Sequence, residues 1–323
     1  MRSKAAIAVL ACVLWLPSAA ALADPAKIGV MTPGPTARVK AMGDGIAALL
    51  AQRGLVRDRD FAIEIRAGDG KPERLPAFAR ELVDAHVAVI VANSYPATRA
   101  AKDATSTTPI VSVSAGEPVE TGLAASLAHP GGNVTGLSDM SSELSAKRLE
   151  LLRLAAPGMK RVALLWNADD LGMTGRYNAA SAAAKAMGIT VVPLGVREPD
   201  DFGSAFDTMS REPPDGILMV TDILTILNRK RVMDYAAAHK IAAIYEVDNF
   251  ARDGGLMSYG PDGKEVLSRV ADLVARILKG GKPADLPFEQ PTRFDLVVNK
   301  KTADGMGLAL PRELLLRADE VIE

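Results

Sequence analysis

Residues 87–96 read VAVIVANSYP, which is a wholly apolar run followed by a short polar turn. Because the run is apolar at every position rather than at alternate ones, it predicts a strand that is buried on both faces. The turn predicts the start of a helix, with Ser94 as the capping residue and Pro96 in the first turn. This stretch therefore indicates one strand–turn–helix unit of an α/β protein.

The same unit recurs along the chain. Short apolar runs that predict strands alternate with segments whose apolar residues recur at helical spacing, which indicates mostly parallel sheets flanked by helices. The pattern restarts after Gly136, so we predict two consecutive α/β units, while the segments from residue 256 onward fit either unit. The predicted strands are residues 28–31, 61–65, 87–91, 109–113, 161–166, 189–192, 217–220, 241–245, 256–259 and 294–298.

Residues 1–23 have the composition of a secretory signal peptide. Arg2 and Lys4 precede an uncharged apolar run at residues 5–16, and residues 21–23 (ALA) supply the small residues of a cleavage site. The run is shorter than the about 20 residues that span a bilayer, so we expect cleavage before Asp24 and an exported, soluble product.

Length and composition exclude several classes of function. The chain has 323 residues, enough for about two domains, and its 38 basic residues are balanced by 39 acidic ones. A net charge of −1 offers no basic surface for nucleic acid. The only cysteine, Cys12, would leave with the signal peptide, and the three histidines are too far apart in sequence to predict a metal site. No phosphate-binding loop or nucleophile elbow occurs, so we expect no cofactor and no enzymatic activity.

Loops at the carboxyl ends of the predicted strands form the candidate site, because open α/β sheets bind ligands there. The loop that starts at Asn93 leads into a helix, and the backbone N–H groups of a helix start bind carboxylates well. The acidic pair Asp169-Asp170 is expected to lie in a solvated loop instead. The candidate ligand-binding residues are Thr32, Asn93, Ser94, Tyr95, Glu117, Asn167, Thr221, Asp222 and Tyr245.

Several longer segments also form a distinctive set: residues 74–77 (RLPA), 81–83 (ELV), 104–111 (ATSTTPIV), 121–137 (TGLAASLAHPGGNVTGL), 147–152 (KRLELL), 254–260 (GGLMSYG), 277–280 (ILKG), 283–287 (PADLP) and 316–323 (LRADEVIE). Together they resemble the ABC transporter substrate-binding proteins whose characterised members bind tryptophan and other aromatic amino acids. The resemblance covers essentially the whole mature chain.

This resemblance implies a type 1 periplasmic binding fold, in which two α/β lobes joined by three chain crossings close around a ligand. We therefore expect a first lobe of residues 24–137 plus about 256–291, and a second lobe of residues 138–255 plus about 292–323. The implied function is that of a monomeric periplasmic protein, the solute-binding component of an ABC importer, which presents a small carboxylate-bearing molecule to a permease in the inner membrane.

Other functions fit parts of the same sequence. A periplasmic sensory protein that presents its ligand to a membrane receptor or kinase would have the same fold and site. A secreted α/β enzyme would need a catalytic motif, and none is recognisable. A cytoplasmic repressor of this fold is disfavoured by the signal peptide and by the absence of DNA-binding helices before the first lobe.

The chain departs from the family at three loops of the candidate site. Residues 93–96 read NSYP where many relatives have Gly-Gly-Thr-Pro, and residues 116–118 read GEP where relatives often have Gly-Asp-Pro. Residues 221–223 read TDI where tryptophan-binding relatives have Thr-Asp-Asn, so the acid is kept and the amide is lost.

For an α-amino acid ligand, we expect contacts in both lobes. The carboxylate would meet the helix start at Ser94 and Tyr95, where the helix dipole favours an anion. The ammonium would meet Asp222 in the other lobe, a residue whose alternative role is to cap a helix. Tyr95 and Tyr245 would form walls around an apolar or aromatic body.

Overall fold

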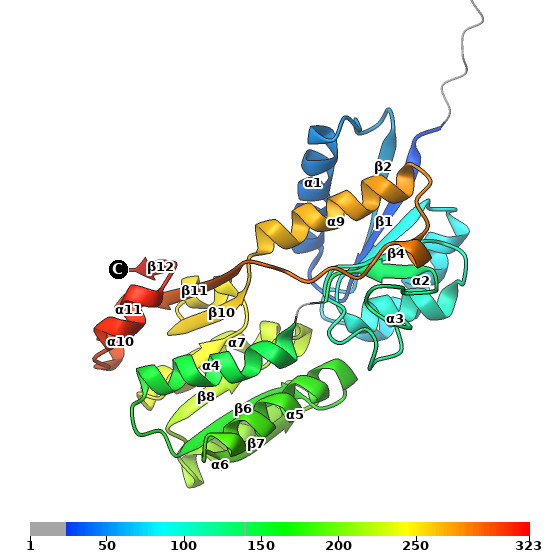
Figure 1. The fold of residues 1–323 in the computed structure, drawn as a ribbon. Coiled ribbons are helices and arrows are strands. Elements are labelled where there is room, and N and C mark those ends of the chain that lie inside the picture. Colours follow the sequence, from blue (N-terminus) through cyan, green and yellow to red (C-terminus); the bar gives the residue numbers. More distant parts are fainter. Residues whose placement is uncertain (1–23, 139) are drawn as a thin grey trace, which may run out of the picture.

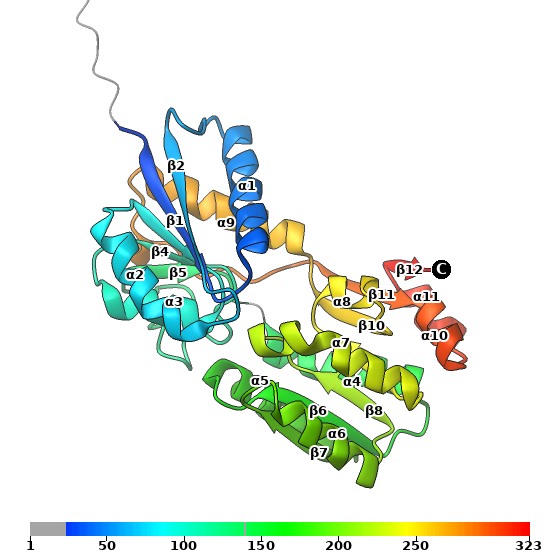
Figure 2. The ribbon, with the colours of Figure 1, turned by 180° about the vertical axis from the view of Figure 1, so that it is seen from behind.

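The computed structural model describes residues 24–138 and 140–323, so the predicted signal peptide lies outside the described residues. The described chain forms two α/β lobes, one above the other in Figure 1. Figure 2 shows the same two lobes from behind, with extended segments running between them. Within the described residues, no helix combines the length and the apolar character that a membrane crossing requires.

The first lobe is built on a parallel sheet of five strands in the order β2-β1-β3-β4-β5. All four residues of β3 are buried, with Val89 and Val91 packed in one core and Ile90 and Ala92 in another, as expected for a sheet covered on both faces. The elements are β1 (Ala26–Thr32), α1 (Thr36–Gln52), β2 (Phe61–Ala67), η1 (Pro72–Arg74), α2 (Leu75–Asp84), β3 (Val89–Ala92), α3 (Tyr95–Ala104), β4 (Ile110–Ser112) and β5 (Val134–Gly136).

The second lobe is built on seven strands in the order β12-β11-β10-β9-β8-β6-β7. Its ladders are parallel except for the pair β10 and β11, which is antiparallel. The elements up to β10 are α4 (Ser141–Ala155), β6 (Arg161–Asn167), α5 (Leu171–Ala186), β7 (Thr190–Val196), α6 (Asp201–Arg211), β8 (Gly216–Met219), α7 (Ile223–Ala238), β9 (Ala242–Tyr245), α8 (Asp248–Arg252) and β10 (Met257–Pro261). The chain then visits the first lobe as α9 (Gly263–Leu278) and η2 (Pro283–Asp285), and ends in β11 (Phe294–Asn299), α10 (Lys300–Met306), α11 (Arg312–Arg317) and β12 (Glu320–Ile322).

Helices cover both faces of each sheet. In the first lobe α1 and α9 pack on one face, and α2 and α3 pack on the other. In the second lobe α4 and α5 share a core with α10 and α11, while α6, α7 and α8 cover the opposite face. The predicted class, two lobes with mostly parallel sheets flanked by helices, is confirmed.

One segment belongs to a different lobe from the one predicted. Residues 256–291 were expected in the first lobe, but β10 lies in the second sheet, where Met257 pairs with Ile244 on one side and Val298 on the other. The backbone ladder places β10 there, and Met257 is fully buried in the second-lobe core. The return to the first lobe begins at α9.

Three stretches of chain pass between the lobes: from β5 to α4, from β10 to α9, and from η2 to β11. The last two are bonded to each other, because the Asp262 N–H donates to the Arg293 carbonyl oxygen at 3.0 Å. Glu265 adds to this contact by accepting from Thr292 Oγ1 at 2.6 Å and from the Arg293 N–H at 2.9 Å. These bonds, led by the one from Thr292 and joined by Arg269, lower the pKa of Glu265 to about 2. Two of the three crossings, from β10 to α9 and from η2 to β11, are therefore held together by hydrogen bonds at the hinge.

Candidate functional site

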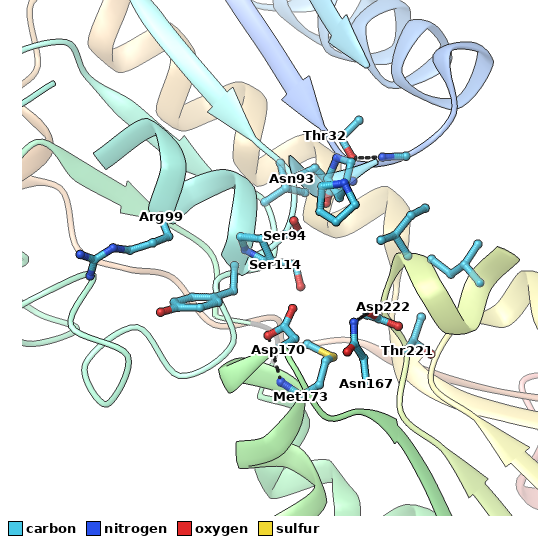
Figure 3. Close-up of a pocket in the computed structure, with 18 of the residues that line it drawn as sticks. Thr32, Asn93, Ser94, Arg99, Ser114, Asn167, Asp170, Met173, Thr221 and Asp222 are labelled. Atoms are coloured by element: carbon cyan, nitrogen blue, oxygen red, sulfur yellow. Dashed lines mark hydrogen bonds between the residues drawn. The ribbon is translucent and has the colours of Figure 1, made fainter. Parts of the chain in front are cut away.

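A cleft of about 670 Å³ separates the lobes at the carboxyl ends of strands from both sheets. This is the position at which α/β proteins bind ligands. Figure 3 shows residues of the first lobe, such as Ser94 and Ser114, opposite Asp170 and Asn167 of the second. Of the nine predicted residues, seven line the cleft: Thr32, Asn93, Ser94, Tyr95, Asn167, Thr221 and Asp222.

Tyr245 is not a wall of the cleft, contrary to the prediction. It is 1% exposed, its ring packs edge-on against Phe250 at 5.6 Å between centroids, and burial raises the pKa of its hydroxyl. Since successive residues of a strand point to opposite faces, the next residue, Glu246, is the one that reaches the cleft. Glu117 also lies away from the cleft lining, which the loop after β4 supplies through Val113 and Ser114 instead.

The first-lobe wall centres on the start of α3. Ser94 caps this helix with its Oγ, which accepts from the Ala97 N–H at a long 3.4 Å. Its backbone angles, φ 100° and ψ 159°, belong to a region that is populated almost only by glycine. Thr98 holds this conformation by donating its hydroxyl to the Ser94 carbonyl oxygen at 2.9 Å. The first turn of α3 borders the cleft and contains no acidic residue; Pro96 within it has no N–H, and the Ala97 N–H is the one bonded to Ser94.

The second-lobe wall presents two helix starts that already carry a carboxylate. Asp170 caps α5, with Oδ1 accepting from the Gly172 N–H at 2.8 Å and the Met173 N–H at 3.3 Å. Asp222 caps α7, with Oδ1 accepting from the Thr225 N–H at 2.9 Å. Asp222 therefore caps a helix and lines the cleft at the same time, so the two roles considered for it do not exclude each other.

Asp170 was assigned to a solvated loop, and this assignment is wrong. The residue is 9% exposed and lines the cleft. The preceding Asp169 also borders the cleft, but it is exposed and pairs with Arg197 at 3.2 Å. Burial raises the pKa of Asp170, against the opposing bond from the Met173 N–H, and the charge of Asp222 raises it further. An Asp directly before a helical pattern is a capping signal, and that signal was available in the sequence.

Asn167 connects the two acidic caps of this wall. Its side chain, at the end of β6, donates Nδ2–H to Asp222 Oδ2 at 2.6 Å, drawn as a dashed line in Figure 3. Its Oδ1 accepts from the Asp169 N–H at 3.1 Å and so shapes the loop that carries Asp170. The second-lobe acids are therefore held in fixed positions before any ligand arrives.

The floor of the cleft contains a buried group of charges that the sequence did not reveal. Glu246, 6% exposed, accepts from Arg148 Nη1 at 3.0 Å through Oε1 and from Arg176 Nη1 at 2.9 Å through Oε2. Arg148 is fully buried and Arg176 is 6% exposed. The three residues come from α4, α5 and the segment after β9, so no local spacing predicts them. Within the described part of the chain, no three His, Cys, Asp or Glu side chains gather as they would around a metal ion.

The rest of the lining is largely aliphatic. This part comes from α7, the segment between β9 and α8, the end of β10 and the first turn of α9, and consists of Ile223, Ile226, Val247, Pro261 and Val266. Because α9 packs in the first lobe and α7 in the second, an apolar group in this part of the cleft would touch both lobes.

The two lobes approach closely around the cleft. A Cβ atom added at Gly34 would lie 3.9 Å from Ile223 Cδ1, and one added at Gly70 would lie 2.7 Å from Leu227 Cδ1. In both pairs the glycine is in the first lobe and the partner is on α7. The arrangement is that of a cleft closed by direct contact between lobes.

The sequence of this chain is similar to those of known proteins. The sequence model of a family described as ABC transporter substrate binding protein matches residues 27–322. A curated relative, the tyrosine-binding protein of Clostridioides difficile (strain R20291), is 25% identical over 264 residues, which are 82% of this chain and 76% of the relative.

Two solved structures agree closely in fold. A conserved domain protein from Vibrio cholerae is 26% identical with a TM-score of 0.86, over 92% of this chain and 99% of that one. An ABC domain from Streptococcus pneumoniae in complex with L-Trp is 25% identical with a TM-score of 0.85, over 92% of this chain and 100% of that one.

Proposed function

The chain belongs to the family of ABC transporter substrate-binding proteins, and from this premise we propose that it is the periplasmic solute-binding component of an ABC importer, carrying an α-amino acid with a large apolar side chain. Proteins of this family bind small molecules and interact with ABC permeases.

The opposed polarity of the cleft walls carries the proposal. Three helix starts face the cleft, and a helix start attracts negative charge. Those of α5 and α7 hold the carboxylates of Asp170 and Asp222, whereas that of α3 has only the neutral Ser94. A ligand carboxylate therefore fits at α3, and a ligand ammonium fits between Asp170 and Asp222, which matches an α-amino acid lying across the two lobes.

The aliphatic part of the lining supports a large apolar side chain on that amino acid. Ile223 and Ile226 on α7 face the region bounded by Pro261 and Val266. Burial of an apolar group is favourable by about 25 cal/mol per Å² of surface removed from water. Since the lining belongs to both lobes, the side chain would stabilise the closed cleft as well as the bound state.

The relatives support the same class of ligand. One is a tyrosine-binding protein and another was solved with L-Trp. Tyr95 is the aromatic residue that the cleft offers, and the remaining apolar lining is aliphatic or proline. We therefore place the ligand's apolar body against the aliphatic lining, with Tyr95 at the mouth.

Calorimetry with matched ligands tests the amino-acid assignment. L-Tryptophan, L-tyrosine and L-leucine are compared with indole-3-propionate, which has the carboxylate and the ring of tryptophan but no amine. We expect binding of at least one amino acid and much weaker binding of indole-3-propionate, because that compound leaves Asp170 and Asp222 without a cation. Equal affinity for tryptophan and indole-3-propionate, or no binding of any amino acid, would overturn the assignment.

Uptake assays test the importer role. A strain that lacks the gene should lose high-affinity uptake of the radiolabelled amino acid identified by calorimetry, and plasmid-borne wild type should restore it. Unchanged uptake together with a lost transcriptional response to the same amino acid would favour a sensory role.

A further inference from the structure

We propose that Arg148 is a positioning residue that, through Glu246, couples the ligand loop of the second lobe to the hinge. The ligand loop is defined here as Thr221 and Asp222, which lie between β8 and α7. The inference rests on the proposed function for the identity of the ligand, but the contacts that carry it do not depend on which amino acid binds.

Glu246 fixes the ligand loop through the backbone. Its Oε2 accepts from the Thr221 N–H at 2.9 Å, so the carboxylate fixes the peptide between Val220 and Thr221, at the start of the ligand loop. The same side chain is 6% exposed, and a carboxylate at that depth must be paired with cations to remain charged. Displacement of the loop toward or away from a ligand therefore displaces the carboxylate and the arginines bound to it.

Arg148 carries the connection from Glu246 to the hinge. Its Nη1 donates to Glu246 Oε1 at 3.0 Å, and its Nε donates to the Tyr259 carbonyl oxygen at 2.8 Å. Tyr259 lies in β10, which runs through Pro261 directly into α9 of the first lobe. One fully buried side chain thus touches both the acid behind the ligand loop and the strand that becomes a hinge crossing.

A backbone contact beside this bond limits how the two segments can move. A Cβ atom added at Gly260 would lie 1.9 Å from the Glu246 carbonyl oxygen, so the backbones of residues 246 and 260 pack directly against each other. The Glu246 side chain and main chain therefore both bear on β10. Because the contact is tight, β10 and the segment after β9 can shift together more readily than they can slide apart.

Arginine is suited to this connection in a way that lysine is not. The planar guanidinium donates from Nε and Nη1 in fixed directions, whereas the single ammonium of lysine cannot reproduce the pair of bonds. Arg148→Lys keeps a positive charge beside Glu246 and breaks the bridge to Tyr259. Arg176→Lys is the matched control, because Arg176 donates to the same carboxylate at 2.9 Å from α5.

Hydrogen exchange without ligand tests the connection first. In Arg148→Lys, backbone exchange should rise about tenfold in residues 257–262 and also in residues 219–226. In Arg176→Lys, exchange in residues 257–262 should stay at the wild-type level. Equal exchange in residues 257–262 in the two variants would overturn the proposal, and this result does not depend on finding the ligand.

Closure of the lobes tests the consequence for function. Fluorophores are placed at Ser106→Cys in the first lobe and Ser204→Cys in the second, both exposed, in a Cys12→Ser background. L-Tyrosine should shorten the distance between fluorophores in wild type and in Arg161→Lys, the control here, because Arg161 lies in the second lobe outside the cleft lining and pairs with Glu212. In Arg148→Lys the change should need about tenfold more L-tyrosine. Identical titrations in the two variants would contradict coupling through Arg148. Absence of binding of L-tyrosine, L-tryptophan and L-leucine in wild type would count against the proposed function and leave the exchange result to decide the coupling.

Discussion

Tyr95, the first residue of α3 in the first lobe, lies against Gly172, in the first turn of α5 in the second lobe. A Cβ atom added at Gly172 would lie 3.5 Å from Tyr95 Cβ and 3.7 Å from Tyr95 Cγ. The same Cβ atom would lie 3.2 Å from Asp170 Oδ1 in its own lobe, so the lobes touch here and even a methyl group at residue 172 would be tightly packed. Because Tyr95 and Gly172 belong to different lobes, a larger side chain at residue 172 gives a way to alter closure.

Gly172→Leu should hold the cleft open. A leucine side chain at this position would overlap Tyr95, and forcing extra methylene groups into a packed contact costs about 1–3 kcal/mol. We expect amino-acid affinity to fall about tenfold or more in calorimetry. Gly175→Leu is the control on the same helix, because a Cβ atom there meets no atom within 4 Å.

The double variant Gly172→Leu/Tyr95→Ala separates the overlap from any effect on Asp170. Removing the ring should recover much of the affinity that Gly172→Leu loses. Failure to recover any affinity would show that the leucine acts on Asp170 or on α5 itself rather than on closure.

The general plan of the fold followed from hydrophobic patterns that are local in sequence. The apolar run at residues 87–91 indicated a buried parallel strand, and β3 has every residue buried. The lobe that receives β10 could not be predicted in this way, because residues 256–259 are apolar in either sheet. Pairing of Met257 with Ile244 and Val298 decided it, and pairing over that sequence distance leaves no local signal.

In the candidate site too, residues marked by a local sequence pattern were predicted, and residues placed by contacts distant in sequence were not. The polar loops at strand ends were found because each follows an apolar run, and Ser94 and Asp222 are both helix caps as their positions suggest. Tyr245 was chosen where Glu246 faces the cleft, because the strand pattern did not reveal which face of β9 ends there. Arg148 could not be predicted, since its contacts with Glu246 and Tyr259 join segments about 100 residues apart in sequence.

Ser94→Gly should raise the free energy of unfolding by about 1 kcal/mol. Glycine relieves a backbone strain of roughly 1–3 kcal/mol, and part of that gain is offset by its greater freedom in the unfolded chain. The lost cap contributes little, because the bond from Ala97 is 3.4 Å long. Ser94→Ala keeps the Cβ atom and loses the bond, so it should be neutral or destabilising. Urea denaturation of the two variants compares the effects, and an equal loss of stability in both would mean that Ser94 is not strained.

Glu265 should make the hinge sensitive to acid. Its pKa in the folded protein is lowered from 4.5 to about 2, so it stabilises the folded state above pH about 4.5 and this contribution is lost as the pH falls toward 2. Glu265→Gln should be less stable than wild type at pH 7, and the difference should shrink as the pH is lowered through this range. Urea midpoints between pH 7 and pH 2.5 measure it. Glu73→Gln, at an exposed site in the first lobe, serves as the control, and a constant difference across this range for Glu265→Gln would remove Glu265 from the hinge interaction.

Asp170→Asn should weaken amine-bearing ligands selectively. Asparagine is also a good helix cap, so α5 should keep its start while the second-lobe wall loses one of the two acids, Asp170 and Asp222, that cap its helices. A bond between charged groups contributes about 1.5–3 kcal/mol, and we therefore expect affinity for the amino acid to fall by about tenfold to a hundredfold with little change for indole-3-propionate. Because burial raises the pKa of Asp170, its carboxylate takes up a proton at a higher pH than an ordinary aspartate, so wild-type affinity for the amino acid should already decline in mildly acidic buffer. In the Asp170→Asn variant this decline should be flatter. Asp169→Asn is the adjacent comparison, since Asp169 also borders the cleft but is exposed and pairs with Arg197 instead of capping α5. Calorimetry of wild type and both variants between pH 8 and pH 4.5 measures these effects, and an unchanged pH profile in Asp170→Asn would show that the ammonium is bound by other groups.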